Sequence, residues 1–394
     1  MSSPDTEISR ALPRVGRRAL AIGLIALAAC AAGAFLAPEQ FFRSYLFAWV
    51  FWTGMTLGCL SIVMLHYLTG GAWGIPIRRP LESGMGTLPL MAILFVPLLF
   101  GLRRLYEWAR PEEVAHDPIL QHKAAYLNSP FAIGRVILYF GSWFLFAYLL
   151  DRWSLRQDRD GASAALARRM QMLSAAGLVM YGLTVTFWSI DWVMSLEPHW
   201  ISTMYGVLYI SGHALAAMAF VIVVTVALAK RPPLAEFVSG EHWHDLAKLT
   251  FAFLMFWAYV SFSQYLIIWA GNLPEEIPWY LRRLQGGWGW IGAALVFVQF
   301  FIPFLLLLSA DRNRNTRLLW KVALLLVVMQ MIDVFWLVRP AASHGRLDLH
   351  WLDFLAPVGI GGVWIAFFLR RLGERPLLPR NDPEFLAAVE HGRH

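Results

Sequence analysis

The chain has 394 residues, of which 58% are hydrophobic and only 15% are charged, and its formal net charge is +7. Soluble domains average about 45–50% apolar and about 25% charged residues, so this composition excludes an ordinary soluble domain and indicates an integral membrane protein. The basic character does not require a nucleic-acid partner, because the cytoplasmic loops of membrane proteins are rich in lysine and arginine.

Ten apolar segments are long enough, or nearly so, to cross the hydrocarbon core of a bilayer, which takes about 20 residues of helix. Backbone polar groups in lipid must pair within their own segment, so the segments are predicted to be α-helices and the fold class all-α. In chain order they cover 19–37, 44–67, 84–101, 131–150, 171–196, 203–228, 248–270, 286–309, 318–338 and 352–369.

The first segment contains Leu-Ala-Ala-Cys at 27–30, a pattern similar to a bacterial lipoprotein cleavage site. The apolar run continues beyond Cys30 and reaches spanning length, so an uncleaved helix is the preferred interpretation, and cleavage stays open. Cys59 is the only other cysteine, which leaves no haem-attachment motif, disulfide framework or iron–sulfur ligand set in the sequence. We expect no redox cofactor and no metal to be bound by this chain.

The distribution of basic residues predicts the orientation. With ten spans both termini lie on one side of the membrane, and that side carries most of the lysines and arginines of the predicted loops, including Arg78 and Arg79 and five arginines between 152 and 169. Because cytoplasmic loops hold the excess of such residues, both termini are predicted to be cytoplasmic.

The second to ninth segments predict an internal repeat. Its matching pairs, in chain order, are WVFWTGMTLG (49–58) and VLYISGHALA (207–216), YEWARPEE (106–113) and IIWAGNLPEE (267–276), LLDR (149–152) and SADR (309–312), and the Ile-Asp dipeptides at 190–191 and 332–333. Four matches in one order predict two parallel four-helix bundles, helices 2–5 within residues 44–196 and helices 6–9 within 197–338. Residues 1–43 and 339–394, which contain helices 1 and 10, are predicted to lie outside the bundles.

Each predicted bundle has an aspartate near the end of an apolar segment. These are Asp191 and Asp333, and each is followed seven residues later by a proline. A charged side chain at the centre of a membrane helix costs about 2.5–3.5 kcal/mol, so such residues face the protein interior and often mark proton or ion routes. Two interpretations stay open: proton transfer, and a structural role through pairing with an arginine or capping a neighbouring helix.

Other polar residues of the middle segments are candidate site residues. Glu197 and His199 follow the fifth segment, where they suit a proton relay or simply lie at the water boundary beside an aromatic belt. His213 is the histidine nearest to mid-membrane. Gln264 and Tyr265 lie in a polar patch that either hydrogen-bonds a quinone head group or joins helices.

Two stretches resemble a known family. SLEPHWISTMYGVLYISG (195–212) and FWAYVSFSQYLIIWAGNLPEE (256–276) are similar to the smaller of the two polysulfide-reductase-like (NrfD-like) membrane subunits of alternative complex III, a bacterial quinol:cytochrome c oxidoreductase. The likeness is most specific from the fifth to the eighth helix, and the ten-helix plan extends it over most of the chain. It implies a bacterial inner (cytoplasmic) membrane and four kinds of partner: a larger NrfD-like membrane subunit, a periplasmic iron–sulfur subunit, multihaem and monohaem cytochrome c subunits, and small membrane anchors.

The resemblance also implies a division of labour. Haem c and iron–sulfur clusters belong to the partners, quinol (for example menaquinol) is oxidised mainly by the larger sister subunit, and this chain scaffolds the respiratory electron-transport complex. Asp191, Glu197 and His199 would then form a proton relay at the outer face, with His213 and Gln264 deeper.

Two rival hypotheses remain at this stage. One is a purely structural membrane subunit. The other is a secondary transporter, which requires helix breaks at matching positions of the two repeats. Pro97 and Pro303 lie inside predicted helices but do not correspond under the repeat, which disfavours the transporter.

Overall fold

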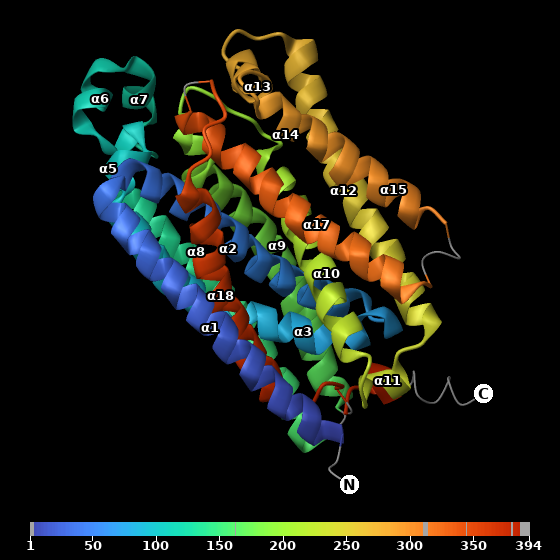
Figure 1. Ribbon diagram of the computed structural model, residues 1–394. Helices are drawn as coiled ribbons and strands as arrows, with labels where there is room; N and C mark the ends of the chain where they lie inside the picture. The colour runs from blue at the N-terminus through green and yellow to red at the C-terminus, as the bar shows by residue number, and fades with distance from the viewer. Residues whose placement is uncertain (1–3, 162, 310–313, 344, 380, 387–394) are drawn as a thin grey trace.

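The protein is described by a computed structural model that covers residues 4–161, 163–309, 314–343, 345–379 and 381–386, with side chains from residue 11 onward. Every regular element in these ranges is a helix, and ten helical segments within them are long and apolar enough to cross a membrane (Figure 1). The all-α membrane fold predicted from the sequence is confirmed.

Each of the ten predicted segments corresponds to one span. The first five spans are α1 (Pro4–Leu36), α2 (Pro38–Thr69), a composite of η1 (Ala72–Gly74), α3 (Ile75–Met85) and α4 (Leu88–Phe100), then α8 (Ser129–Asp160), and α9 (Ala164–Trp192) with η3 (Met194–Leu196). The last five are α10 (Tyr205–Leu228), α12 (Gly240–Gly271), a composite of α14 (Trp288–Ala294), the π-helical η4 (Leu295–Phe301) and α15 (Ile302–Leu307), then α17 (Thr316–Val338) with η5 (Arg339–Ala342), and α18 (Trp351–Gly373).

Short helices lie between the spans. They are α5 (Leu102–Leu105), η2 (Glu107–Ala109), α6 (Pro111–His116), α7 (Pro118–Lys123), α11 (Leu234–Phe237) and α13 (Ile277–Leu284). The start of α1 and the last described residues, 381–386, lie at the same end of the molecule, called here the terminal end, whereas α5–α7 and α13 lie at the opposite, distal end (Figure 1).

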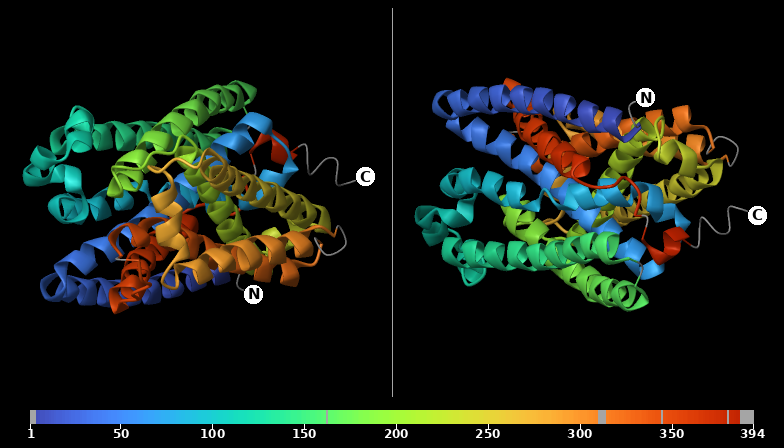
Figure 2. Two further views of the ribbon diagram at one scale, coloured as in Figure 1. Left: turned by 90° about the horizontal axis from the view of Figure 1, so that it is seen from above. Right: turned by 90° about the horizontal axis from the view of Figure 1, so that it is seen from below.

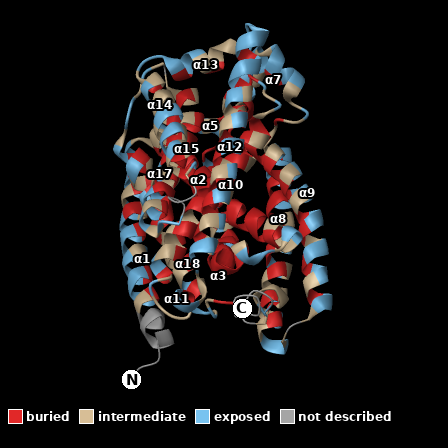
Figure 3. Ribbon diagram, turned by 90° about the vertical axis from the view of Figure 1, so that its right-hand side faces the viewer, coloured by how far each residue is buried: buried red, intermediate tan, exposed pale blue. Residues whose placement is uncertain are grey.

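The helices α2 and α10 form the centre of the molecule. α2 packs against α10, α9, α4 and α18, and α10 packs against α12, α17 and α9. Burial is concentrated in α2, α3 and α10, while α1, α8 and α9 turn exposed sides outward (Figure 3). α1 lies along α18, on the opposite side of the molecule from α8 and α9 (Figure 2). The division into two bundles stays a prediction, and residues 310–312 of its third match lie outside the described ranges.

Two glycines explain the close approach of the central helices. A Cβ atom added to Gly58 of α2 would lie 2.1 Å from the carbonyl oxygen of His213 in α10, and one added to Gly54 would lie 2.7 Å from the His213 Nε2 atom. Glycines four residues apart share one face of a helix and allow two backbones to approach closely within a membrane. This contact fixes His213 against α2.

Several helix boundaries differ from the prediction, and the second and third spans show two of the physical reasons. α2 begins at Pro38 rather than 44, because proline is favoured in the first helical turn and Glu39 complements the helix dipole there. The third span begins at Ala72 rather than 84, because α3 buries charged residues that pair with one another. Arg78 and Arg79, predicted to be loop residues, therefore lie inside the protein.

Candidate functional site

Asp191 lies in the last turn of α9 and is buried. Arg135 of α8 donates two hydrogen bonds to its carboxylate, from Nε to Oδ2 at 2.8 Å and from Nη2 to Oδ1 at 3.0 Å. The Tyr139 hydroxyl donates a third, to Oδ2 at 2.7 Å. A two-point arginine contact orients both partners. The geometry favours a structural role for Asp191, as the partner that joins α9 to α8, and its part in proton transfer stays a prediction.

The guanidinium group of Arg135 is enclosed by aromatic rings. Its Cζ atom lies 3.8 Å from the centre of the Tyr126 ring and 4.4 Å from that of Phe131, and its Nη1 donates to the Tyr126 carbonyl oxygen at 2.9 Å. Cation–π contacts of this kind are strongest where water is excluded. The pair of Arg135 and Asp191 therefore fixes the start of α8 and the chain just before it.

Glu197 follows η3 and is also buried. Arg282 donates from Nη1 to its Oε1 at 2.7 Å, and Arg283 donates from Nη2 to its Oε2 at 2.9 Å, both from α13. Arg283 also donates to the carbonyl oxygens of Trp336 and Leu337 at the end of α17. Glu197 thus joins the loop after the fifth span to α13 and, through Arg283, to the end of α17.

His199 lies at the surface of the distal end. Its Nε2 is 2.6 Å from Oδ2 of Asp117, the residue that caps α7 by accepting hydrogen bonds from the N–H groups of Ile119 and Leu120. Desolvation acts to raise the pKa of Asp117, but the two backbone N–H groups and His199 together hold that pKa below its usual range. This arrangement favours a surface role for His199.

The three residues predicted as an outer relay are not connected to one another. Asp191 bonds to α8, Glu197 to α13 and His199 to α7, and no hydrogen bond joins any two of the three within the described residues. A relay through them has no direct hydrogen-bonded path in this structure.

A second group of polar residues meets inside the molecule, where α2, α10 and α17 come together. Tyr209 and His213 of α10, Gln330 and Asp333 of α17, and Gly54 of α2 line a cavity of about 20 Å³. Residues three or four apart share one face of a helix, which is why each pair points into the same space. Since one water needs about 10–15 Å³, the cavity has room for one.

The polar atoms around this cavity are incompletely paired. Trp257 of α12 donates a hydrogen bond from Nε1 to Oδ2 of Asp333 at 2.9 Å, and within the described residues Asp333 forms no ion pair. Nδ1 of His213 lies 3.3 Å from the Tyr181 hydroxyl, whereas Nε2 of His213 and Nε2 of Gln330 are buried without a hydrogen-bond partner in the described part of the chain. Buried polar atoms of this kind are rare, and they are the donors and acceptors that a water in the cavity would join.

Two residues that align in the sequence repeat both lie at the cavity. Gly54 and Gly212, which align in the two halves, both face it: the Cβ position of Gly54 is 2.7 Å from Nε2 of His213, and that of Gly212 is 3.1 Å from Oε1 of Gln330. The absence of a side chain at both positions leaves the space in which the polar groups meet.

Asp191 and Asp333 match in the sequence but differ in surroundings. Asp191 is neutralised by Arg135, whereas Asp333 accepts one hydrogen bond from an indole and has no ion-pair partner in the described part of the chain. Of the two aspartates, only Asp333 lacks a cationic partner within the described residues.

The predicted quinone contacts lie apart from this cavity. Gln264 is buried in α12, where its Oε1 accepts from the Ser202 hydroxyl at 3.1 Å and its Nε2 lies 3.5 Å from the Tyr280 hydroxyl. Tyr265 is exposed, and its ring packs edge-on against Tyr280. The geometry favours the helix-joining interpretation of Gln264, and the quinone contact stays a prediction.

Sequence reasoning missed a buried ionic cluster near the terminal end. Glu82 of α3 is fully buried between Arg78, whose Nε is 3.2 Å away, and Arg79, whose Nη1 is 2.6 Å away. Arg78 and Arg79 lie four and three residues before Glu82, and opposite charges at this spacing on one helix could have predicted the cluster. Instead, two arginines before an apolar run suggested a loop. The cluster's other members are Tyr67, Asp151, Ser154, Asp158, Arg375 and Asp382.

Replacement of one member, Asp382→Asn, is expected to loosen the C-terminal segment. Asp382 pairs with Arg78, and Glu384 lies 3.5 Å from His66, so both residues hold the segment against α2 and α3. Loss of a hydrogen-bonded charge costs about 1.5–3 kcal/mol, while Arg78 keeps Glu82 as a partner. Limited proteolysis is the measurement: the variant is expected to be cut within residues 374–386 faster than the wild type. Equal rates would show that Asp382 does not hold the segment.

No protein-family model matches the chain, and no curated protein matches it significantly.

Proposed function

We propose that this chain is a membrane subunit of a respiratory quinol:cytochrome c oxidoreductase of the alternative complex III type, in which it scaffolds the complex and contributes to proton transfer. The observation that carries the proposal is the group of Asp333, His213 and Gln330 around one small cavity inside the membrane-spanning helices. Ionisable residues in such positions are usually functional. The type of complex rests on the resemblance of residues 195–212 and 256–276.

The chemistry of this group suits proton transfer. A carboxyl group and an imidazole around a space for one water can exchange a proton through hydrogen bonds, because each can both give and accept one. In the proposal, the distal end faces the periplasm and receives the protons of quinol oxidation, and haem c and iron–sulfur clusters in partner subunits carry the electrons. Gln264 and Tyr265 are the candidate quinone contacts on this chain.

A purely structural subunit is the second candidate, and the buried carboxylates at and just after the end of the fifth span favour it. Asp191 is bound by Arg135 and Tyr139, and Glu197 is bound by two arginines, so both carboxylates have the partners expected of residues that hold helices together. We assign these residues to scaffolding and Asp333 and His213 to proton transfer.

A secondary transporter is disfavoured by the positions of the helix breaks. The third span is interrupted at Gly86 and Thr87, and the eighth changes to a π-helix over Leu295–Phe301. Under the repeat the third span corresponds to the seventh, which is the continuous helix α12. Broken helices in matching positions, as expected around a transporter site, are not seen in the described residues.

Purification from native membranes tests the proposal. The tagged chain, extracted in a mild detergent, is expected to bring down a second multi-pass subunit and proteins with the absorbance of c-type haem, and the preparation is expected to reduce cytochrome c with quinol. An unrelated tagged membrane protein from the same cells is the control. If the chain is recovered without haem-containing partners under conditions that keep other respiratory complexes intact, the proposal is wrong.

A further inference from the structure

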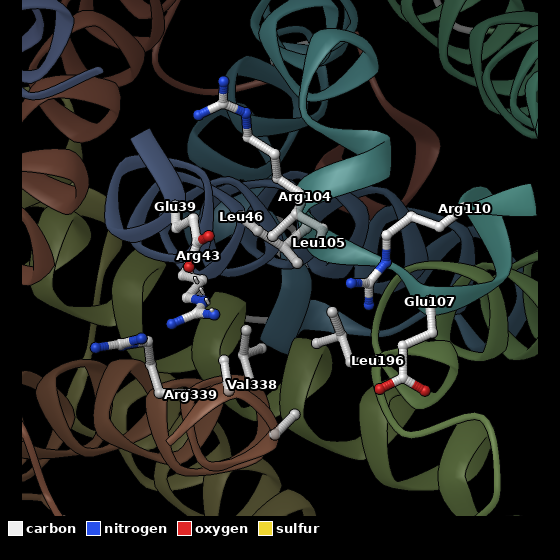
Figure 4. A pocket seen from close by; sticks show the side chains of 12 residues that line it. Glu39, Arg43, Leu46, Arg104, Leu105, Glu107, Arg110, Leu196, Val338 and Arg339 are labelled. Atoms are coloured by element: carbon white, nitrogen blue, oxygen red, sulfur yellow. Dashed lines mark hydrogen bonds and ion pairs between the residues drawn. The ribbon is translucent and has the colours of Figure 1, made fainter. Parts of the chain in front are cut away.

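A second cavity, of about 210 Å³, opens at the distal end between the start of α2, the segment α5–η2 and η5 (Figure 4). It is separate from the cavity of Asp333 and is more than ten times larger than the space one water needs, about 10–15 Å³. Its charged lining residues are Glu39, Arg43, Arg104, Glu107, Arg110 and Arg339.

Positive charge exceeds negative charge in this lining, with four arginines against two glutamates. Arg339 is buried and is held by Asp353, whose Oδ1 lies 3.0 Å from Nε of Arg339. Among the residues that the structure describes, Arg43 has one ion pair, with Glu39 at 3.4 Å in its own helix. The net charge of the cavity wall therefore favours an anion.

The arginines around the opening have unused donors. Within the described residues, Nε of Arg110 is buried without a hydrogen-bond partner, and the one ion pair of Arg110 is a 3.4 Å contact with Glu113. Arg104 forms no ion pair within the described residues and lies 5.9 Å from the Phe42 ring. Arg110 points toward the centre of the group, whereas Arg104 extends away from it at the rim (Figure 4).

We propose that this cavity binds a phosphate group, supplied by the headgroup of an anionic phospholipid or by inorganic phosphate. Guanidinium groups bind the oxygens of phosphate through two parallel hydrogen bonds, and several arginines from different elements can surround one such group. Here Arg43 of α2, Arg110 just after η2 and Arg339 of η5 come from three different elements, and Arg104 of α5 lies at the rim. The site is independent of the function proposed above.

The surroundings of the cavity favour a phospholipid as the source. Phe35 and Leu36 end α1 just before Glu39, Phe100 ends α4 four residues before Arg104, and all three side chains are largely exposed. Exposed apolar side chains beside arginines at the end of membrane helices match the boundary between acyl chains and headgroups. A lipid at this place would put its phosphate among the arginines and its chains along α1 and α4.

The test uses the full chain and two probes. The detergent-purified protein is titrated with inorganic phosphate by calorimetry, and the protein in phosphatidylcholine nanodiscs with or without phosphatidylglycerol is examined for retained lipid by native mass spectrometry. Arg43→Gln and Arg110→Gln are each expected to weaken binding about 10-fold or more. Arg103→Gln is the matched control, because Arg103 is an exposed neighbour outside the cavity.

The results distinguish a lipid headgroup from inorganic phosphate as the source of the bound phosphate group. If the protein selectively retains phosphatidylglycerol and Arg110→Gln abolishes this retention, the site binds a lipid headgroup. If inorganic phosphate binds and phosphatidylglycerol does not reduce that binding, the site binds the free ion. The proposal is overturned if neither probe binds, or if Arg103→Gln weakens binding as much as Arg110→Gln. Size-exclusion chromatography of each variant verifies that it is folded.

Discussion

Asp333→Asn is expected to lower the quinol:cytochrome c turnover of the assembled complex by on the order of 100-fold, since a positioned acid or base contributes about 10²–10⁴-fold to proton transfer. Asparagine keeps the size of the side chain and can still accept the hydrogen bond that Trp257 donates at 2.9 Å. It removes only the ability to bind and release a proton. The measurements are steady-state turnover and the protons released per electron, with haem c content as the check on assembly.

Asp333→Glu is the matched control, because it restores an ionisable group to the same helix position. It is expected to recover part of the activity that asparagine loses. If Asp333→Asn assembles fully and keeps wild-type turnover and proton release, then Asp333 is a structural residue, and proton transfer through this cavity is disproved. If the complex with Asp333→Asn assembles and its proton release does not change, scaffolding remains as the role of the chain.

Arg135→Leu is expected to lower the free energy of unfolding by about 3–5 kcal/mol, which is the cost of leaving a buried charge without its partner. Arg135 and Asp191 are both more than nine-tenths buried, and two hydrogen bonds, at 2.8 and 3.0 Å, join them. The loss would uncouple the start of α8 from the end of α9. Denaturant-induced unfolding of the purified chain in detergent is the measurement.

Two further variants test the reason for this loss. Arg135→Leu combined with Asp191→Asn is expected to be more stable than Arg135→Leu alone, because the unpaired charge is then removed. Arg152→Leu, at an exposed arginine of the same helix, is expected to change stability by less than about 0.5 kcal/mol. If Arg135→Leu alone is as stable as the wild type, the ion pair does not hold these helices together.

The spans could be predicted from the sequence because a hydrocarbon core imposes a minimum apolar length on any helix that crosses it. Their ends could not, since the apolar criterion detects only the part of the helix in contact with hydrocarbon. α12 begins at Gly240 rather than 248, capped by Ser239, and α8 continues to Asp160 rather than 150. Caps support such extensions, and in α12 the buried side chains of Trp243, Leu246 and Ala247 also anchor the extension.

The candidate site was predicted in part. The repeat identified Asp191, Asp333 and the glycine pair, but it implied the same surroundings for both aspartates. Arg135 was visible within the predicted segment 131–150. Its contact with Asp191 depends on the rotation of α8 about its axis, and the spacing of residues within one segment does not determine how two helices face each other.

The small size of the cavity beside Asp333 bears on the electrical insulation of the membrane. A route for protons must not leak sodium or potassium ions, which cross water-filled passages together with several waters of hydration. At Gly58 the backbones of α2 and α10 pack closely, and the cavity that these two helices line together with α17 has a volume of about 20 Å³. A space for one water can pass a proton along hydrogen bonds but cannot hold a hydrated cation.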